Sequence, residues 1–104
     1  MKKVSFRIRR QYFDEIVIGE KKEELRSHTP FWIKRLAKAD VAVFVCGKNV
    51  HRRWIKKVWV GFPEEVLGRP LSEQGQKDIK TETCLVVELG DVYHLPLPTT
   101  GEEE

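Results

Sequence analysis

Hydrophobic and polar positions alternate strictly near the start of the chain. Val4, Phe6 and Ile8 are apolar, and the residues between them are polar or basic. A period of two is typical of a β-strand with one buried face. The period then lengthens, and apolar side chains recur at helical spacing up to Gly19, which stands where a helix-ending glycine is expected. The pattern therefore predicts a strand followed by a helix over residues 10–18.

The next stretch, residues 20–26, is polar, and its pattern fits a strand and a continued helix equally well. After it, Thr29 is a suitable cap for a helix whose first position is Pro30. This second short helix is expected to bury a stripe of apolar side chains. The stripe consists of Trp32, Ile33, Leu36 and Ala39.

The middle of the chain predicts two strands joined by a turn. Residues 41–46 form a continuous apolar run that ends at a Gly-Lys-Asn turn. Residues 51–60 mix apolar and basic side chains, and their alternation slips near Lys56 and Lys57, as at a β-bulge. Trp54 and Trp59 lie in this second strand. The pattern is compatible with one ring that faces inward and one that faces outward, and equally with two core tryptophans.

Residues 62–82 are polar and rich in turn-forming glycine and proline, which predicts a loop with one helical turn near residues 63–67. The last clear strand is expected at 83–89, with a short further strand at 92–95. The final residues, 96–104, are rich in Pro, Thr and Glu and are expected to form a disordered tail.

These elements predict a single domain over residues 1–95. Strands separated by two short helices, with a polar insertion before the last strand, are typical of a mainly β, α+β protein. We expect a small, partly open β-barrel flanked by helices. An open α+β sandwich is the alternative architecture.

Charge changes this picture because it is unevenly distributed. Residues 1–60 carry 16 Lys and Arg against 6 Asp and Glu, and residues 61–104 carry 3 against 10. Net charges of +10 and −7 indicate a basic face suited to phosphate, unless the two halves interleave and neutralise each other. The charged fraction of 34% is typical of heat-adapted proteins and of nucleic-acid binders alike.

The chain is expected to be cytoplasmic. No apolar run approaches the ~20 residues of a membrane span, and the first residues lack the apolar part of a signal peptide. Cys46 and Cys84 lie far apart, each in an apolar run, which favours buried free thiols over a disulfide.

The segment Gly19-x-Lys21-x-x-Glu24-x-Arg26 resembles the hallmark of the ASCH family, part of the PUA-like superfamily. The strand and helix before it, the Trp-bearing helix and apolar strand after it, and the closing strand extend the resemblance over residues 3–95. The resemblance implies a small stand-alone prokaryotic or archaeal PUA-like β-barrel. It also implies a cleft that binds RNA or a nucleotide-like ligand.

The chemistry of the motif agrees with a binding role. In a strand, Glu24 and Arg26 share one face and Lys21 lies on the other, so a joint site needs a bend between them. A carboxylate accepts hydrogen bonds from the amino edge of a base, and arginine offers a planar fork for phosphate or guanine. Lys21 adds a flexible positive charge. The alternative is a solvated strand on which these charges simply pair, and the resemblance favours the ligand-facing role.

Four further residues complete the predicted ligand site. Ser27 follows the motif directly, and Phe31 opens the next helix, where a free ring could stack on a base. Arg7 and Arg9 supply positive charge from the outer face of the first strand.

No metal and no cofactor are expected. The histidines and cysteines show no metal-ligand spacing, and there is no phosphate-binding glycine loop. A binding module is favoured, and a small nucleoside hydrolase or ribonuclease is the alternative. The family's amidohydrolase branch has a threonine at the position of Glu24, beside a lysine that matches Lys21. Without that hydroxyl, acylated cytidine is disfavoured as a substrate, while hydrolysis with Glu24 as general base and Lys21 as electrophilic partner stays open.

Overall fold

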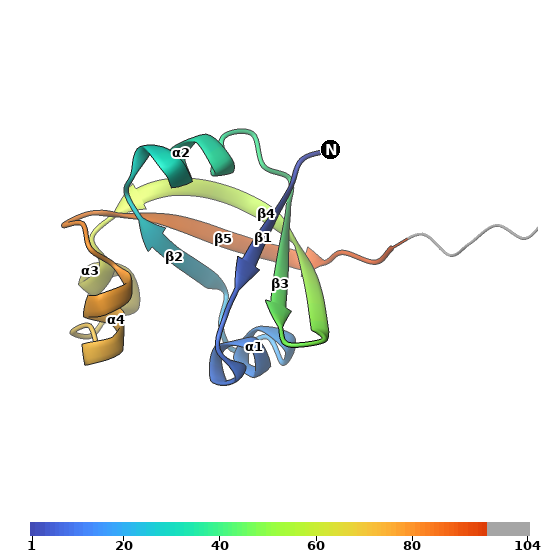
Figure 1. The fold of residues 1–104 in the computed structure, drawn as a ribbon, viewed down its shortest axis with the longest axis horizontal. Coiled ribbons are helices and arrows are strands. Elements are labelled where there is room, and N and C mark those ends of the chain that lie inside the picture. Colours follow the sequence, from blue (N-terminus) through green and yellow to red (C-terminus); the bar gives the residue numbers. More distant parts are fainter. Residues whose placement is uncertain (96–104) are drawn as a thin grey trace, which may run out of the picture.

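Five strands form one curled, mixed sheet in the order β1-β3-β4-β5-β2 (Figure 1). The structure is a computed structural model that describes residues 1–95, so the predicted tail at 96–104 lies outside the described residues. The elements in chain order are β1 (Lys3–Arg7), α1 (Arg10–Val17), β2 (Glu23–Ser27), α2 (Pro30–Leu36), β3 (Val41–Cys46), β4 (Asn49–Gly61), α3 (Pro63–Leu67), α4 (Glu73–Asp78) and β5 (Cys84–Val92).

The sheet curls into a half-barrel. Strand β1 pairs in parallel with β3, and the other neighbouring strands are antiparallel. Strands β1 and β2 are the two edges, so the barrel remains open between them. The α+β class and the flanking helices agree with the sequence prediction.

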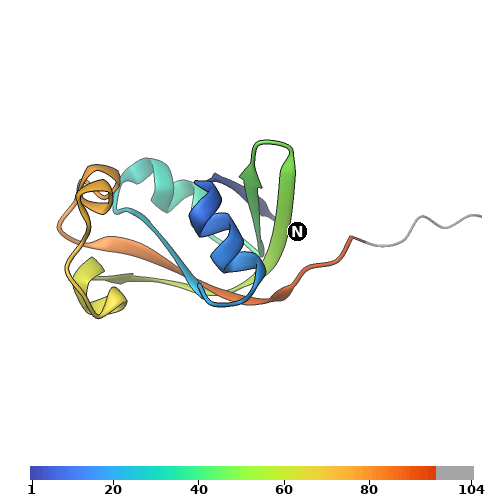
Figure 2. The ribbon, with the colours of Figure 1, turned by 90° about the horizontal axis from the view of Figure 1, so that it is seen from below.

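The concave face of the sheet holds the main core. Helices α1 and α2 lie on the same side of the long strands β4 and β5 (Figure 2). Val4 and Phe6 of β1 are buried as their alternation predicts, and they pack with Phe13 and Ile16 of α1 and Leu36 of α2. The first strand and first helix are therefore confirmed.

The second helix is confirmed together with its cap. Thr29 Oγ1 accepts a hydrogen bond from the backbone N–H of Trp32, and Pro30 occupies the first turn. The predicted burial of Ile33 is wrong: this side chain is 46% exposed because the helix is short and only its Trp32 and Leu36 side reaches the core.

The opposite face of β2 and β5 has a small core of its own. Leu25, Cys84 and Val86 pack there against Leu67 and Ile79, which come from the chain around α3 and α4. Both helices lie at the same end of the sheet in the two views (Figures 1 and 2). The excursion from β4 to β5 is thus anchored to the sheet rather than extended into solvent.

Three details of the second half differ from the prediction. The turn at α3 is present, but α4 was missed, and the expected strand at 92–95 is wrong because Val92 is the last residue of β5. Strand β5 extends further than expected because it continues to pair with the long β4, as far as Arg53.

The predicted bulge is confirmed. The register of β4 against β5 shifts on both sides of Ile55, between Arg53 and Lys57. Because of the shift, Ile55 and Val58 both contact the core although they are an odd number of positions apart in the strand. Trp54 and Trp59 face outward at 41% and 38% exposure, so neither is a core tryptophan.

Both cysteines are free. Within residues 1–95, no helix is long and apolar enough to cross a membrane.

Candidate functional site

The strand register explains why two charged side chains enter the half-barrel. Glu24 pairs with Val87 and Arg26 with Leu85, and both partners on β5 belong to the main core. Side chains of paired residues project from the same face of a sheet. Glu24 and Arg26 therefore point toward the concave side, while Leu25 between them packs on the other face.

Lys21 joins them because the chain bends before the strand begins. Strand β2 starts at Glu23, and the backbone N–H groups of Glu20 and Lys21 both donate to the carbonyl oxygen of Glu15 at the end of α1. This turn brings Lys21 Nζ to 3.4 Å from Glu24 Oε1. The bend that a joint site requires is thus present.

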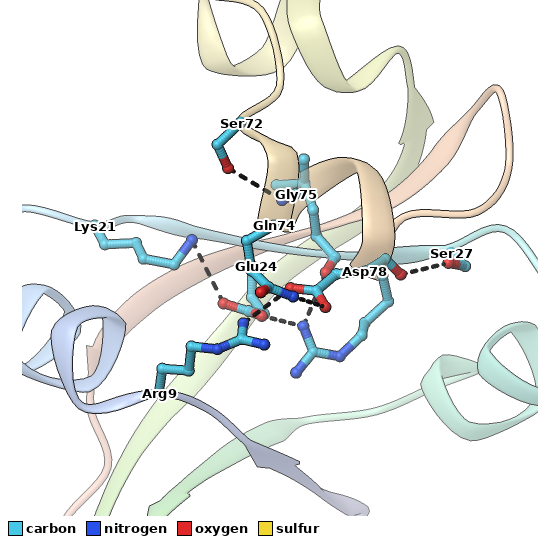
Figure 3. A network of polar contacts seen from close by, with 10 residues as sticks. Arg9, Lys21, Glu24, Ser27, Ser72, Gln74, Gly75 and Asp78 are labelled. Carbon is cyan, nitrogen blue, oxygen red and sulfur yellow. Dashed lines mark hydrogen bonds and ion pairs between the residues drawn. The ribbon is translucent and has the colours of Figure 1, made fainter.

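Glu24 is the most deeply buried charged residue of the site, at 6% exposure. Its Oε2 accepts a hydrogen bond from Nη1 of Arg26, with which it forms an ion pair. Its Oε1 receives no hydrogen bond from any of residues 1–95, and the Lys21 ammonium forms an ion pair with it (Figure 3). One carboxylate oxygen is therefore still able to accept a donor.

Arg26 is held in place from several sides. Its Nη1 also donates to the carbonyl oxygen of Leu25 at 2.8 Å. Its Cζ lies 4.9 Å from the ring centre of Phe6 and 5.2 Å from that of Trp32, within cation–π range. The guanidinium is thus fixed against two aromatic faces, with 18% of the side chain exposed.

A cavity of about 510 Å³ lies beside these side chains, at the opening between β1 and β2. This volume is within the roughly 300–1,000 Å³ of small-molecule sites. Five cationic side chains and two carboxylates line it, together with the aromatic rings of Tyr12 and Trp32. The charged residues are Arg7, Arg9, Lys21, Glu24, Arg26, Arg69 and Asp78.

An ion pair between Arg9 and Asp78 joins two segments of the cavity wall, the chain after β1 and the end of α4. Nη1 of Arg9, just after β1, lies 3.0 Å from Oδ2 of Asp78, the last residue of α4 (Figure 3). Burial raises the pKa of Asp78, but hydrogen bonds from Arg9 and Gln74 and the charges of Arg9 and Arg26 outweigh it. The pKa of Asp78 therefore lies below its ordinary value.

Two of the predicted site residues lie elsewhere. Ser27 Oγ donates to the carbonyl oxygen of Asp78 and accepts from the backbone N–H of Lys80, so it ties β2 to the end of α4. Phe31 is 62% exposed and lies edge-on to Trp32. Neither side chain lines the cavity.

Among the charged and aromatic residues of the cavity wall, the sequence analysis missed four. Tyr12 falls in the first predicted helix, Trp32 was assigned to the buried stripe of the second, and Arg69 and Asp78 fall in the predicted loop. A capping signal was present for α4, because Ser72 Oγ accepts the backbone N–H of Gly75. No signal in the sequence showed that this helix would approach β1.

Comparisons with protein-family models, with curated proteins and with solved structures find no match for this chain. Among residues 1–95, no three His, Cys, Asp or Glu side chains are grouped so as to hold a metal ion.

Proposed function

We propose that this protein binds RNA or a nucleotide in the cavity between β1 and β2, as a PUA-like half-barrel of the ASCH type. The observation that carries the proposal is the buried Glu24 carboxylate, which has one oxygen without a hydrogen bond and lies in a cavity lined mainly by cations. A ligand that satisfies both features carries a hydrogen-bond donor and a negative charge. Nucleotides with an amino-bearing base have both.

The base is expected to reach Glu24. An exocyclic amino group of cytosine, adenine or guanine can donate to Oε1, and uracil has no such group. In doing so it replaces the Lys21 ammonium, whose flexible stem allows it to move aside. The rings of Tyr12 and Trp32 in the cavity wall offer faces on which a base can stack.

The phosphate is expected at the rim. Arg7, Arg9 and Arg69 supply guanidinium groups that can hold phosphate oxygens through two parallel hydrogen bonds. Arg7 and Arg9 come from the basic amino-terminal part of the chain, and Arg69 comes from the segment between α3 and α4. Their charges explain how a cavity with two carboxylates can still attract an anion.

Isothermal titration calorimetry with the four nucleoside monophosphates and with short RNAs measures the binding affinities that test the proposal. We expect binding of cytidine, adenosine or guanosine monophosphate to exceed that of uridine monophosphate, and Glu24→Gln to remove this preference. Arg26→Ala should weaken binding of all four, and Arg10→Ala is the matched control, because Arg10 is an exposed arginine that does not line the cavity. Absence of binding to every nucleotide and RNA at low salt would refute the proposal, because electrostatic binding is strongest there.

Hydrolysis is the second candidate, and the contact between Lys21 Nζ and Glu24 Oε1 favours it. A carboxylate beside an ammonium can activate water while the ammonium polarises a carbonyl or phosphoryl oxygen. Incubation with RNA and with acylated nucleosides tests this activity. Turnover by the wild type that Glu24→Gln and Lys21→Ala both abolish would establish it, and turnover that survives Glu24→Gln would remove Glu24 from the mechanism.

A further inference from the structure

A second hollow of about 600 Å³ lies on the other side of Lys21. Its wall combines the chain before β2 with β4 and β5. Four cationic side chains and one carboxylate line it, with the ring of Trp54. The charged residues are Lys21, Lys22, Arg53, Lys56 and Asp91.

The cations of this hollow differ in what they do. Arg53 is fully engaged: it donates to the carbonyl oxygens of Ile16 and Gly90 at 2.8 and 3.2 Å, and so holds α1 against β5. Lys22 and Lys56 are exposed and form no ion pair with any of residues 1–95. Two ammonium groups are therefore available to an anion.

The sheet is irregular at this place. Between Ile55 and Lys57 the extra residue of β4 is Lys56, and between Arg53 and Ile55 the extra residue belongs to β5, at Gly90 and Asp91. Lys56, Gly90 and Asp91 all line the second hollow. Bulges often re-aim side chains next to binding sites, and here both irregularities coincide with one hollow.

Trp54 provides an aromatic face beside these charges. Its side chain is 41% exposed and is supported by Tyr93, whose ring lies edge-on with 5.0 Å between centroids. A supported and partly exposed tryptophan next to free lysines has the composition of a single-strand binding surface, where bases stack and cations follow the backbone.

We infer that the ligand is single-stranded RNA of at least two nucleotides, with one nucleotide in the first cavity and its neighbour in the second hollow. Lys21 lines both the first cavity and the second hollow, so the phosphodiester that links the two nucleotides passes over this residue of the protein. Lys22 and Lys56 bind the next phosphate, and Trp54 stacks the second base. This inference rests on the proposed nucleotide binding and specifies which class of ligand is bound.

The test compares a nucleoside monophosphate with the tetranucleotide of the same base. In the wild type we expect the tetranucleotide to bind at least about tenfold more tightly, since a second base and phosphates are engaged. The double variant Lys22→Ala/Lys56→Ala should lose most of this gain. It should also reduce the magnitude of the slope of log K against log salt by about 0.7, because the two lysines bind one phosphate. Its affinity for the monophosphate should not change.

Trp54→Leu tests the stacking face and should weaken the tetranucleotide alone, by about 5- to 150-fold, which is the effect of one base–aromatic stack. Lys57→Ala is the matched control, because Lys57 is an exposed lysine of the same strand that lines neither space. Thermal melting of each variant establishes that it is folded.

Two results would overturn the inference while leaving nucleotide binding in place. One is a tetranucleotide that binds no more tightly than the monophosphate. The other is a gain that survives both Lys22→Ala/Lys56→Ala and Trp54→Leu, or falls as much in Lys57→Ala. If neither ligand binds to the wild type, the proposed function fails and the inference fails with it.

Discussion

The ion pair of Glu24 and Arg26 occupies positions that the rest of the concave face fills with apolar side chains. A buried ion pair gains little over well-packed apolar residues, because both ions lose their hydration. Replacing these two residues together with Lys21, by Glu24→Leu, Arg26→Met and Lys21→Met, should therefore leave the fold intact, because no cation is left without its counter-ion. We expect the free energy of unfolding to equal that of the wild type or to exceed it by up to about 3 kcal/mol.

The single change Glu24→Leu should have the opposite effect. It leaves Arg26 and Lys21 without their counter-ion, with 18% and 19% of their side chains exposed. Removing one partner of a fully buried pair costs about 3–5 kcal/mol, and partial solvation of the two cations reduces this to about 2–3 kcal/mol. Lys57→Met, which breaks a solvent-exposed pair with Glu88, should cost less than about 1 kcal/mol.

Guanidinium unfolding followed by far-ultraviolet circular dichroism measures these differences. Dichroism is preferable to fluorescence because Trp32 contacts Arg26, so the substitution itself would alter its emission. Equal m-values would show that the same surface is exposed on unfolding. A triple variant more than about 2 kcal/mol less stable than the wild type would contradict the reasoning, since these charges would then be needed for folding rather than for a ligand.

Three further predictions concern other parts of the molecule. Asp78→Asn should lower the melting temperature at neutral pH by an amount that vanishes on acidification. The pKa of Asp78 is lowered in the folded state, so its pairing with Arg9 stabilises the fold above the ordinary aspartate pKa, and this stabilisation is lost as the pH falls through the folded-state pKa. Melting temperatures of the wild type and the variant that still differ in acid would refute this. In alkylation followed by mass spectrometry, Cys84 should react only on unfolding and Cys46 sooner, because Cys84 is buried and burial raises the pKa of its thiol. Gly68→Ala should cost about 1 kcal/mol in chemical unfolding, because residue 68 ends α3 at φ 70°.

The apolar pattern predicted most of the sheet. The alternating pattern of β1 and the continuous apolar run of β3 identified both strands, and the break in the alternation of β4 located its bulge. Strand β2 could not be assigned in the same way, because Glu24 and Arg26 point toward the core side and reverse the expected pattern. The one strand that the pattern left open is the strand that carries the candidate site.

The cavity itself could not be predicted, because it depends on contacts between distant segments. Asp78 reaches Arg9 across 69 positions of the chain, and Ser27 bonds to the backbone of the same aspartate. Such pairings leave no periodic trace in a single sequence. The motif indicated Lys21, Glu24 and Arg26, which lie together, but not the helix that lies across from them.

The open edge of the half-barrel couples ligand binding to the position of α4. Arg9 is one of the guanidinium groups proposed to hold phosphate, and in the structure it is paired with Asp78. A phosphate that takes two hydrogen bonds from Arg9 competes with that carboxylate, so binding should release one of the side-chain contacts that hold the end of α4. Leu67 and Ile79 also line the cavity, but their apolar contacts with the small core on the other face of the sheet do not depend on Arg9 and keep the segment attached. Binding should therefore loosen α4 without detaching it, which hydrogen exchange at the backbone amides of 76–79 would detect as faster exchange in the complex.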